Sequence, residues 1–329
     1  MAEEERALVV PVTQGDVSDL IREDVAAARH YADASRAEST RKKYIGAWRA
    51  FDTWCRDRGA TTLPADPLVV AAYLAREAQR GLSPSAVQLA LAAIAWVHRR
   101  AGMQPPQRTE RGVAISEVVS GVRREHGRPP KRKAAADADV VRDVLRAISG
   151  ASLRDLRDRA LLAFGMASCM RRSEIVALRL EDIRRVPEGY RVMIARSKTD
   201  QEGQGAEIAI PEGRRLRPVH HLEAWLAAGG IADGFLFRRI SNDGRKVTVD
   251  PMSDRSVARV VQERVGAAGY DPSEFAAHSL RAGFLTAAAR AGASIFDMQR
   301  QSRHKSVQVL SNYVRSARLF EDHAGEDFL

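Results

Sequence analysis

Apolar side chains in the first third of the chain recur at the spacing of amphipathic helices. Tyr44, Trp48, Phe51 and Cys55 follow one another at intervals of four, three and four residues, which places them on one helical face. Ser39-Thr40 precedes this run and predicts an N-terminal cap there.

Three more helices are expected before residue 125. Asp66-Pro67 and Ser83-Pro84 each open an apolar run of helical period, because proline is tolerated in a first turn that needs no backbone N–H. A fourth helix is expected over about 113–122. Since no strand-like alternation occurs among these runs, residues 25–122 are predicted to form a small all-helical domain.

The second half is again mainly helical but contains two strand-like segments. Residues 190–195 and 206–210 have strand patterning and are joined by a polar turn, 199–205. Residues 137–316 are therefore predicted to form an α+β domain that is mainly α, with a small antiparallel sheet. The expected helices cover residues 138–149, 153–168, 173–180, 214–228, 253–267, 278–291, 294–301 and 306–315.

The composition is that of a globular chain of about two domains. Apolar residues make up 45% of 329, enough for a core in each half. No run approaches the ~18 apolar residues of a membrane span, and residues 1–6 are acidic where a signal peptide would be basic. Two cysteines outside any Cys/His cluster supply neither a disulfide framework nor a structural zinc site. We therefore expect a protein of the reducing cytoplasm, neither membrane-spanning nor secreted.

The charge balance indicates an anionic partner. Lys and Arg number 52 against 42 Asp and Glu, a net charge of +10. Residues 1–24, interpreted as a flexible leader, hold seven acids and two bases, so they carry −5 and the remainder carries +15. Proline and glycine disfavour a helix over residues 123–136, which predicts a basic linker that is either simply solvated or crosses a phosphate backbone. Its cations are Arg123, Arg124, Arg128, Lys131, Arg132 and Lys133.

Five chemically distinctive elements occur in order along the second half. The chain has no nucleotide phosphate-binding loop, HExxH motif or EF-hand spacing, so nucleotide hydrolysis and zinc proteolysis have no support. Each element alone is a weak signal, but a His followed nine residues later by Tyr is expected by chance only ~0.1–0.2 times in such a chain, and the ordered set is far rarer. In order they are Arg171, Lys198, His278-Ser-Leu-Arg281, His304 and Tyr313.

With this set, the chain resembles the tyrosine recombinase (phage integrase) family over residues 35–329. The resemblance implies a helical, SAM-like core-binding domain, a linker, and a catalytic domain with the family's Arg, Lys, His-x-x-Arg, His/Trp and Tyr. The sequence departs from the family at Arg172, where an aliphatic residue is usual, and at Ser302-Arg-His304, which replaces the usual Leu-Gly-His. Four short segments resemble the sequence of one particular member: residues 53–56, 98–102, 196–199 and 312–315.

The resemblance implies a site that breaks and rejoins phosphodiester bonds. Arg171 and Arg281 would donate to the non-bridging phosphate oxygens, with His304 as a third donor. Tyr313 would attack phosphorus, with His278 as the base, and form a 3′-phosphotyrosyl bond. Because that bond stores the energy of the phosphodiester, no cofactor, metal ion or ATP is expected.

Two further residues have implied roles. Lys198, on the turn between the strands, would protonate the departing deoxyribose 5′ oxygen. Lys246 lies in another candidate turn and competes for that role. Glu174, one helical turn after Arg171, would orient an arginine. Taken singly, each site residue also has a structural interpretation, and for Tyr313 it is a place in the core.

The resemblance also implies partners. These are a double-stranded DNA site with inverted half-sites and further copies of the chain, as a dimer on one site and a tetramer in the synapse, with residues 317–329 docked on the neighbouring protomer. The expected location is the cytoplasm, on the nucleoid. The expected DNA contacts, besides the linker cations, are Thr40, Arg41, Lys43, Ser85, Gln88 and Arg255.

Two other functions stay open at this point. A non-catalytic DNA-binding or architectural protein could keep the fold, although the intact set of catalytic side chains argues against it. A type IB topoisomerase or telomere resolvase would keep the chemistry, but the two-domain length and the assembly-like tail disfavour it.

Overall fold

The structure, a computed structural model, describes residues 19–129, 133–195 and 205–317. The chain divides into two compact units between Pro130 and Lys131, inside the segment predicted as a linker. Within the described ranges, no helix is both long and apolar enough to cross a bilayer.

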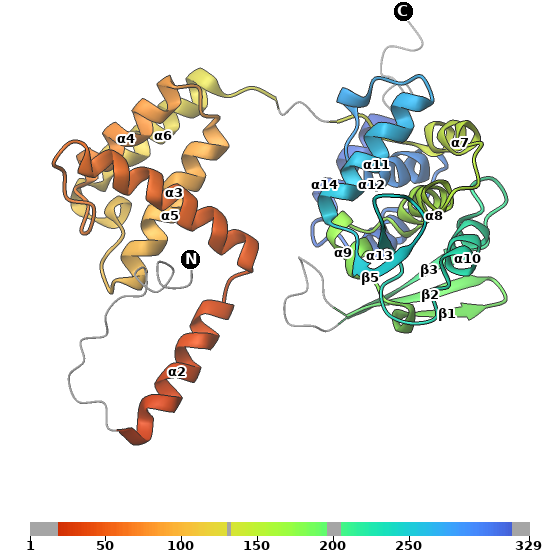
Figure 1. Cartoon of the computed structure of the whole chain (residues 1–329). Coiled ribbons are helices and arrows are strands. Elements are labelled where there is room, and N and C mark those ends of the chain that lie inside the picture. Colours follow the sequence, from red (N-terminus) through yellow and green to blue (C-terminus); the bar gives the residue numbers. More distant parts are fainter. Residues whose placement is uncertain (1–18, 130–132, 196–204, 318–329) are drawn as a thin grey trace, which may run out of the picture. The chain divides into compact units, whose positions relative to one another are not determined.

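The first unit is a helical bundle (Figure 1). Asp66 and Ser83 accept hydrogen bonds from the backbone N–H groups of Leu68 and Ala86, so the predicted caps of α4 and α5 are confirmed. Its helices are α2 (Asp19–Ala34), α3 (Glu38–Arg56), α4 (Pro67–Gln79), α5 (Pro84–Arg100) and α6 (Val113–His126).

The apolar face predicted for α3 forms the centre of this bundle. Phe51 and Cys55 are fully buried, and Trp48 is 6% exposed. The rings of Phe51 and Tyr73 of α4 meet edge-on, 5.1 Å between centroids. Burying a side chain of this size contributes about 1.5–3 kcal/mol, so this face holds the bundle together.

Three helix ends in this unit differ from the sequence prediction. The N-cap of α3 is Ala37, with no side-chain cap, so the capping role predicted for Ser39-Thr40 is wrong: both lie inside the first turn. Helix α2 begins at Asp19, within the segment interpreted as a flexible leader, because its alanine-rich sequence favours a helix. Helix α6 continues to His126, since glycine and proline begin only at residue 127, and the first four residues of the predicted linker are therefore helical.

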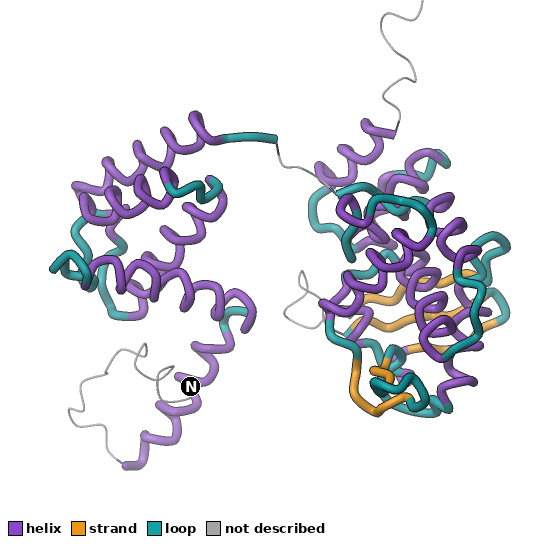
Figure 2. The backbone as a smooth tube through the Cα atoms, turned by 45° about the horizontal axis from the view of Figure 1, so that its top comes forward, coloured by secondary structure: helices purple, strands orange, loops and turns teal. Residues whose placement is uncertain are grey.

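The second unit is mainly helical, with strands gathered on one side of it (Figure 2). Ser152 and Asp155 cap α8 reciprocally, and Ser253 and Ser294 cap α11 and α13. Its helices are α7 (Ala138–Ala147), α8 (Leu153–Ser168), α9 (Arg172–Ala177), α10 (Pro218–Gly229), α11 (Asp254–Ala267), α12 (His278–Arg290), α13 (Ile295–Ser302) and α14 (Val307–Ala317).

Two small antiparallel sheets accompany these helices. The predicted hairpin is present as β2 (Gly189–Ile194) and β3 (Ala206–Pro211), and β1 (Ile183–Val186) extends it to a three-stranded sheet in the order β1-β2-β3. A second sheet pairs β4 (Arg238–Ile240) with β5 (Val247–Pro251). Strands β1, β4 and β5 were not predicted, because each is short and two of them contain arginine.

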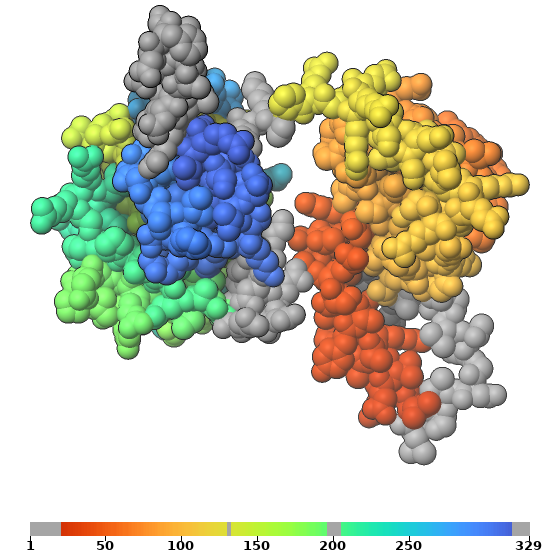
Figure 3. All heavy atoms as spheres, turned by 180° about the vertical axis from the view of Figure 1, so that it is seen from behind, coloured from red at the N-terminus to blue at the C-terminus, as the bar shows by residue number. Residues whose placement is uncertain are grey.

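Helix α8 lies at the centre of the second unit. Leu161 and Phe164 are fully buried, and they belong to one core cluster with Ile194 and Ile208 of the sheet and Trp225 of α10. Helix α14 packs on α12 and α13 and forms part of the blue surface in Figure 3. The core thus fixes the C-terminal end of α8 close to α12.

The last residues of the segment predicted as a linker are bonded to residues at and just before the start of α12. The N–H of Ala134 donates to the carbonyl of Glu274 at 2.8 Å, and that of Ala136 to the carbonyl of Ser279 at 2.9 Å. Gly283 lies further along α12, and a Cβ there would overlap the carbonyl of Ala136. The chain therefore enters the second unit in contact with the helix that carries His278 and Arg281.

Candidate active site

Arg171 is positioned by the end of one helix and the start of the next. Cys169, after α8, takes a left-handed backbone conformation (φ 51°) that turns the chain. Arg171 then caps α9: its N–H donates to Glu174 Oε2 at 2.9 Å, and its Nη1 donates to Glu174 Oε1 at 2.8 Å. The Glu174 side chain is 4% exposed and that of Arg171 19%, so a buried carboxylate holds one side of this guanidinium.

Arg281 is buried where three segments meet. It lies in the first turn of α12 with 1% of its surface exposed. Its Nη1 donates to the carbonyl of Cys169, and its Nη2 donates to the carbonyl of Ser302 at the end of α13. A buried guanidinium held by two carbonyls in this way is rigid, because a lost partner would leave a charge without compensation.

His304 lies directly against Arg281. Its Nδ1 is 3.3 Å from Arg281 Nη2 and 2.8 Å from Ser302 Oγ. Burial, followed by the charges of Arg281 and Arg171, lowers the pKa of His304 to about 4, so the imidazole is neutral at pH 7. Arg281 Nη2 also lies 3.4 Å from Nε2, so the guanidinium faces the ring. In the tautomer whose Nδ1 accepts, the proton is on Nε2, where it can donate to an incoming oxygen.

His278 begins α12 and faces the same charges. Desolvation by surrounding atoms, and then the charges of Arg281 and Arg171, lower its pKa below the ordinary value of histidine. His278 is nevertheless exposed to solvent. A neutral, accessible imidazole beside two guanidiniums has the properties that a general base requires.

The lowered pKa of His304 predicts a pH dependence of folding. The unfolded histidine binds its proton near pH 6.5 and the folded one only near pH 4, so the unfolded state binds more protons between these values. Stability is therefore lost as pH falls through this window. Urea unfolding measures the free energy of unfolding at pH values across this window. In His304→Gln this free energy should fall less with acid than in the wild type, by no more than about 2 kcal/mol after discounting for solvent screening.

His221 provides the comparison for this experiment. Burial and the neighbouring His220, Arg159 and Arg217 lower the pKa of His221 to about 4 as well. The substitution His221→Gln should reduce the same acid loss independently, and the two effects should add. An unchanged acid loss in His304→Gln, beside a reduced one in His221→Gln, would contradict the neutral state assigned to His304.

Tyr313 lies on α14 and is partly buried. It packs against the small cluster formed by Cys169, Leu285 and Leu310 together with Ala289 and Met298. Helix α14 packs on α12 and α13, the two helices that hold Arg281 and the residues before His304. The tyrosine thus lies at the edge of this cluster, on a helix that packs on the one that carries Arg281.

The structure brings most of the predicted catalytic residues into one cluster. Arg171, Arg281, His278 and His304 influence one another electrostatically, and Glu174 belongs to the same group. Lys198 lies outside the described residues. Ser302-Arg-His304 is only a departure from the family pattern at the level of the sequence, and no function was predicted for Arg303, whose side chain donates to Glu174. The signal that could have pointed to Arg303 in the sequence is a basic residue directly before His304.

The residues predicted to contact DNA lie on helices of both units. Lys43, Ser85 and Gln88 are exposed on α3 and α5, and Thr40 and Arg41 are partly exposed in the first turns of α3. Arg123 and Arg124 are exposed on α6, and Arg255 is exposed on α11. Lys133 donates to the carbonyl of Ser273 at 2.5 Å, whereas Lys131 and Arg132 lie outside the described residues.

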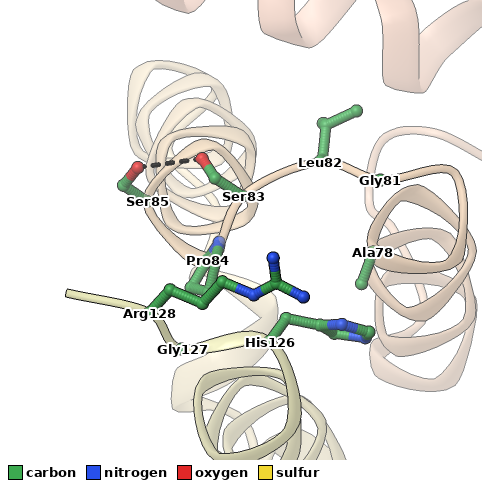
Figure 4. Close-up of a pocket in the computed structure, with 9 residues that line it drawn as sticks. All are labelled: Ala78, Gly81, Leu82, Ser83, Pro84, Ser85, His126, Gly127 and Arg128. Atoms are coloured by element: carbon green, nitrogen blue, oxygen red, sulfur yellow. Dashed lines mark hydrogen bonds between the residues drawn. The ribbon is translucent and has the colours of Figure 1, made fainter. Parts of the chain in front are cut away.

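A cavity lies beside Ser85 in the first unit (Figure 4). It measures about 600 Å³ and lies between the start of α5 and the residues that follow α6. Ser83 and Ser85 are hydrogen-bonded to each other at 3.0 Å on one side, and the Arg128 guanidinium lies near the His126 ring on the other. Hydroxyl and cationic donors around one opening suit an anionic oxygen.

Comparison with known proteins assigns the family. The model of the "Phage integrase family" matches residues 136–319. An integrase/recombinase XerD homolog of Selenomonas ruminantium is 33% identical over 299 residues, covering 90% of this chain and 87% of the relative. Recombinase Cre of Escherichia phage P1 is 27% identical over 299 residues, covering 85% of this chain and 84% of the relative. Cre is the family member that the four short segments resemble, so this similarity is confirmed.

A solved structure supports the same assignment at the level of the fold. The Tn1549 transposon integrase, in complex with transposon right end DNA, has a TM-score of 0.59 and 16% identity, covering 91% of this chain and 98% of that one. The chain belongs to the phage integrase family and is a tyrosine recombinase, an enzyme that cleaves and rejoins DNA strands at specific sites.

Proposed function

We propose that the cluster around Arg281 is the active site for strand exchange and that Tyr313 is its nucleophile. The observation that supports this most is the convergence of two guanidiniums and two neutral imidazoles on the helix on which α14 packs. Two fixed cations match the negative charge of a phosphodiester, and neutral imidazoles can accept or donate a proton.

The proposed reaction exchanges one phosphate ester for another. The Tyr313 oxygen attacks phosphorus and its proton passes to His278. The bond between phosphorus and the deoxyribose 5′ oxygen breaks, and Lys198 protonates that oxygen. Arg171, Arg281 and the His304 N–H stabilise the non-bridging oxygens in the transition state. The reverse reaction with a second strand restores the phosphodiester.

The general acid can be identified with a substrate that needs none. A sulfur at the 5′ bridging position leaves as a thiolate without protonation, because a thiol is far more acidic than an alcohol. Lys198→Ala should cleave ordinary DNA about 10²–10⁴-fold slower, with most of the rate recovered on the sulfur substrate. Single-turnover cleavage of both substrates measures this.

Lys246→Ala is the matched control. Lys246 is exposed in the turn between β4 and β5. The variant should cleave both substrates at the wild-type rate. Loss of ordinary cleavage and recovery on the sulfur substrate in Lys246→Ala, with an unaffected Lys198→Ala, would move the general acid to Lys246.

The proposed partner is a double-stranded DNA site with inverted half-sites. We expect contacts from the predicted residues of both units, with the Arg128 cavity beside Ser85 receiving a backbone phosphate. Arg255 is expected to read a guanine. A dimer on one site, a tetramer in the synapse with residues 317–329 docked on a neighbour, and action on the nucleoid in the cytoplasm complete the proposal.

The test begins with the DNA site. Duplexes that the protein binds are selected from a random pool and sequenced, and inverted repeats are the expected result. A nicked duplex of the selected site, from which the cleaved fragment diffuses away, should then give a protein–DNA adduct that survives SDS. A bound site without adduct would contradict the catalytic function and favour a DNA-binding regulator.

A further inference from the structure

Arg303 occupies a backbone position that normally excludes a side chain. It ends α13 in the left-handed conformation, with φ 56° and ψ 40°, and its N–H donates to the carbonyl of Gln299 at 2.7 Å. Glycine is the usual residue at such a helix end, because a Cβ is disfavoured there. The presence of a long cationic side chain at this point therefore calls for a function of that side chain.

The Arg303 side chain points into the protein. Its exposed fraction is 10%, and its Nη2 donates to Glu174 Oε2 at 2.7 Å. Its Nε and Nη1 are buried with no hydrogen-bond partner. Buried N–H groups without partners are unfavourable, and proteins keep them mainly where function requires the group.

One carboxylate joins Arg303 to Arg171. Glu174 Oε1 accepts from Arg171 Nη1, while Oε2 accepts from the Arg171 backbone N–H and from Arg303 Nη2. The contact connects the start of α9 with the end of α13, which immediately precedes His304. The two segments that carry phosphate-binding groups are thus bonded to each other through Glu174.

The charges of these three residues do not cancel. Arg171 and Arg303 carry two positive charges against one on Glu174. Burial by itself would raise the pKa of Glu174, but the charge of Arg303 and the hydrogen bonds from Arg171 and Arg303 lower it, so the carboxylate is ionised. Without Arg303, Glu174 would neutralise Arg171 and reduce the attraction of this guanidinium for a phosphate.

Building on the proposed function, we propose that Arg303 is a positioning residue for DNA cleavage. It holds Glu174 in place and offsets its negative charge. Arg171 thereby keeps both its orientation and its positive charge for the scissile phosphate. Arg303 acts through Glu174 and not by binding DNA.

Two substitutions remove the side chain in different ways. Arg303→Gly deletes it and suits the left-handed backbone, so this variant should fold, as thermal unfolding can verify. Arg303→Met keeps the length and removes the charge. On the nicked duplex of the selected site, each should lower the single-turnover rate of adduct formation about 10–100-fold. The dissociation constant for the uncleaved duplex should change less than about 3-fold, because Arg303 is not a DNA contact.

The double variant Arg303→Met/Glu174→Gln distinguishes positioning from general packing. Glu174→Gln removes the negative charge that Arg303 offsets, so the double variant should cleave no more slowly than Glu174→Gln alone. Arg303→Lys, which keeps the charge, should recover part of the rate. The control is Arg300→Met, because Arg300 lies on the same helix, is 78% exposed and pairs only with Asp297 in the described contacts; it should cleave as the wild type does.

Three results would overturn the proposal: wild-type rates in both Arg303 variants, losses that multiply in the double variant, or loss of DNA binding in parallel with cleavage. The wild-type protein separates these from failure of the proposed function. A wild-type protein that binds the duplex and forms no adduct would refute the catalytic function itself, together with the role of Arg303.

Discussion

Tyr313→Phe is expected to bind its DNA site with unchanged affinity and to form no covalent adduct. The substitution removes only the hydroxyl oxygen that forms the bond to phosphorus and leaves the ring in the cluster with Leu285 and Leu310. Loss of a nucleophile leaves only the rate of the unassisted reaction, so adduct formation should fall at least ~10⁴-fold. SDS gels of labelled nicked duplex measure the adduct, and gel shifts measure binding.

Tyr270→Phe is the matched control for this experiment. The Tyr270 hydroxyl donates to Asp143 Oδ2 at 3.0 Å, in the same unit but outside the catalytic cluster. Its removal should lower stability by only about 1 kcal/mol and leave the adduct at the wild-type level. An adduct that persists in Tyr313→Phe and disappears in Tyr270→Phe would assign the nucleophile to Tyr270.

Arg281→Lys is expected to bind DNA and to cleave it about 10²–10³-fold more slowly. A lysine keeps the charge but cannot reach the carbonyls of Cys169 and Ser302 in one fixed fork and also present further donors to a phosphate. The loss should shrink on a duplex whose scissile phosphate carries a neutral methyl in place of one non-bridging oxygen, because less charge then needs stabilisation. Single-turnover rates on the two duplexes measure both effects.

Arg290→Lys controls for the substitution on the same helix. Arg290 ends α12, is 59% exposed and pairs with Asp137 at 2.8 Å. A surface pair of this kind contributes little, so the variant should melt and cleave as the wild type does. A wild-type cleavage rate in Arg281→Lys, or an equal loss on both duplexes, would contradict the role of Arg281 in neutralising phosphate charge.

Sequence prediction succeeded where the cause of the structure is local. Asp66 and Ser83 cap helices through bonds that span two or three residues, so a short segment contains the whole signal. The short strands of the second sheet are different. Arg238 of β4 is 8% exposed, whereas Val249 of β5 is 77% exposed, which reverses the pattern by which strands are recognised. Only pairing between the two strands defines them.

The candidate catalytic side chains could be named from the sequence, but their surroundings could not. The order of Arg171, Arg281 and His304 along the chain indicated the candidates, and the family resemblance implied their roles. The lowered pKa of His304 and the bonds of Arg281 to two carbonyls depend on packing between α8, α12 and α13, which spacing does not encode. Arg303 was missed for the same reason, since its side chain bonds to a carboxylate, that of Glu174, 129 residues away in the sequence.

The bonding of residues 134–136 to the start of α12 sets the reach of the connection between the units. The first unit ends its last helix at His126, and Ala134 is already fixed to Glu274. Eight peptide steps separate these two points, and fully extended they span at most about 26–29 Å. His126 and Ala134 therefore remain within that distance of each other when the protein binds a duplex. Each residue inserted there would lengthen the tether by about 3.3–3.6 Å.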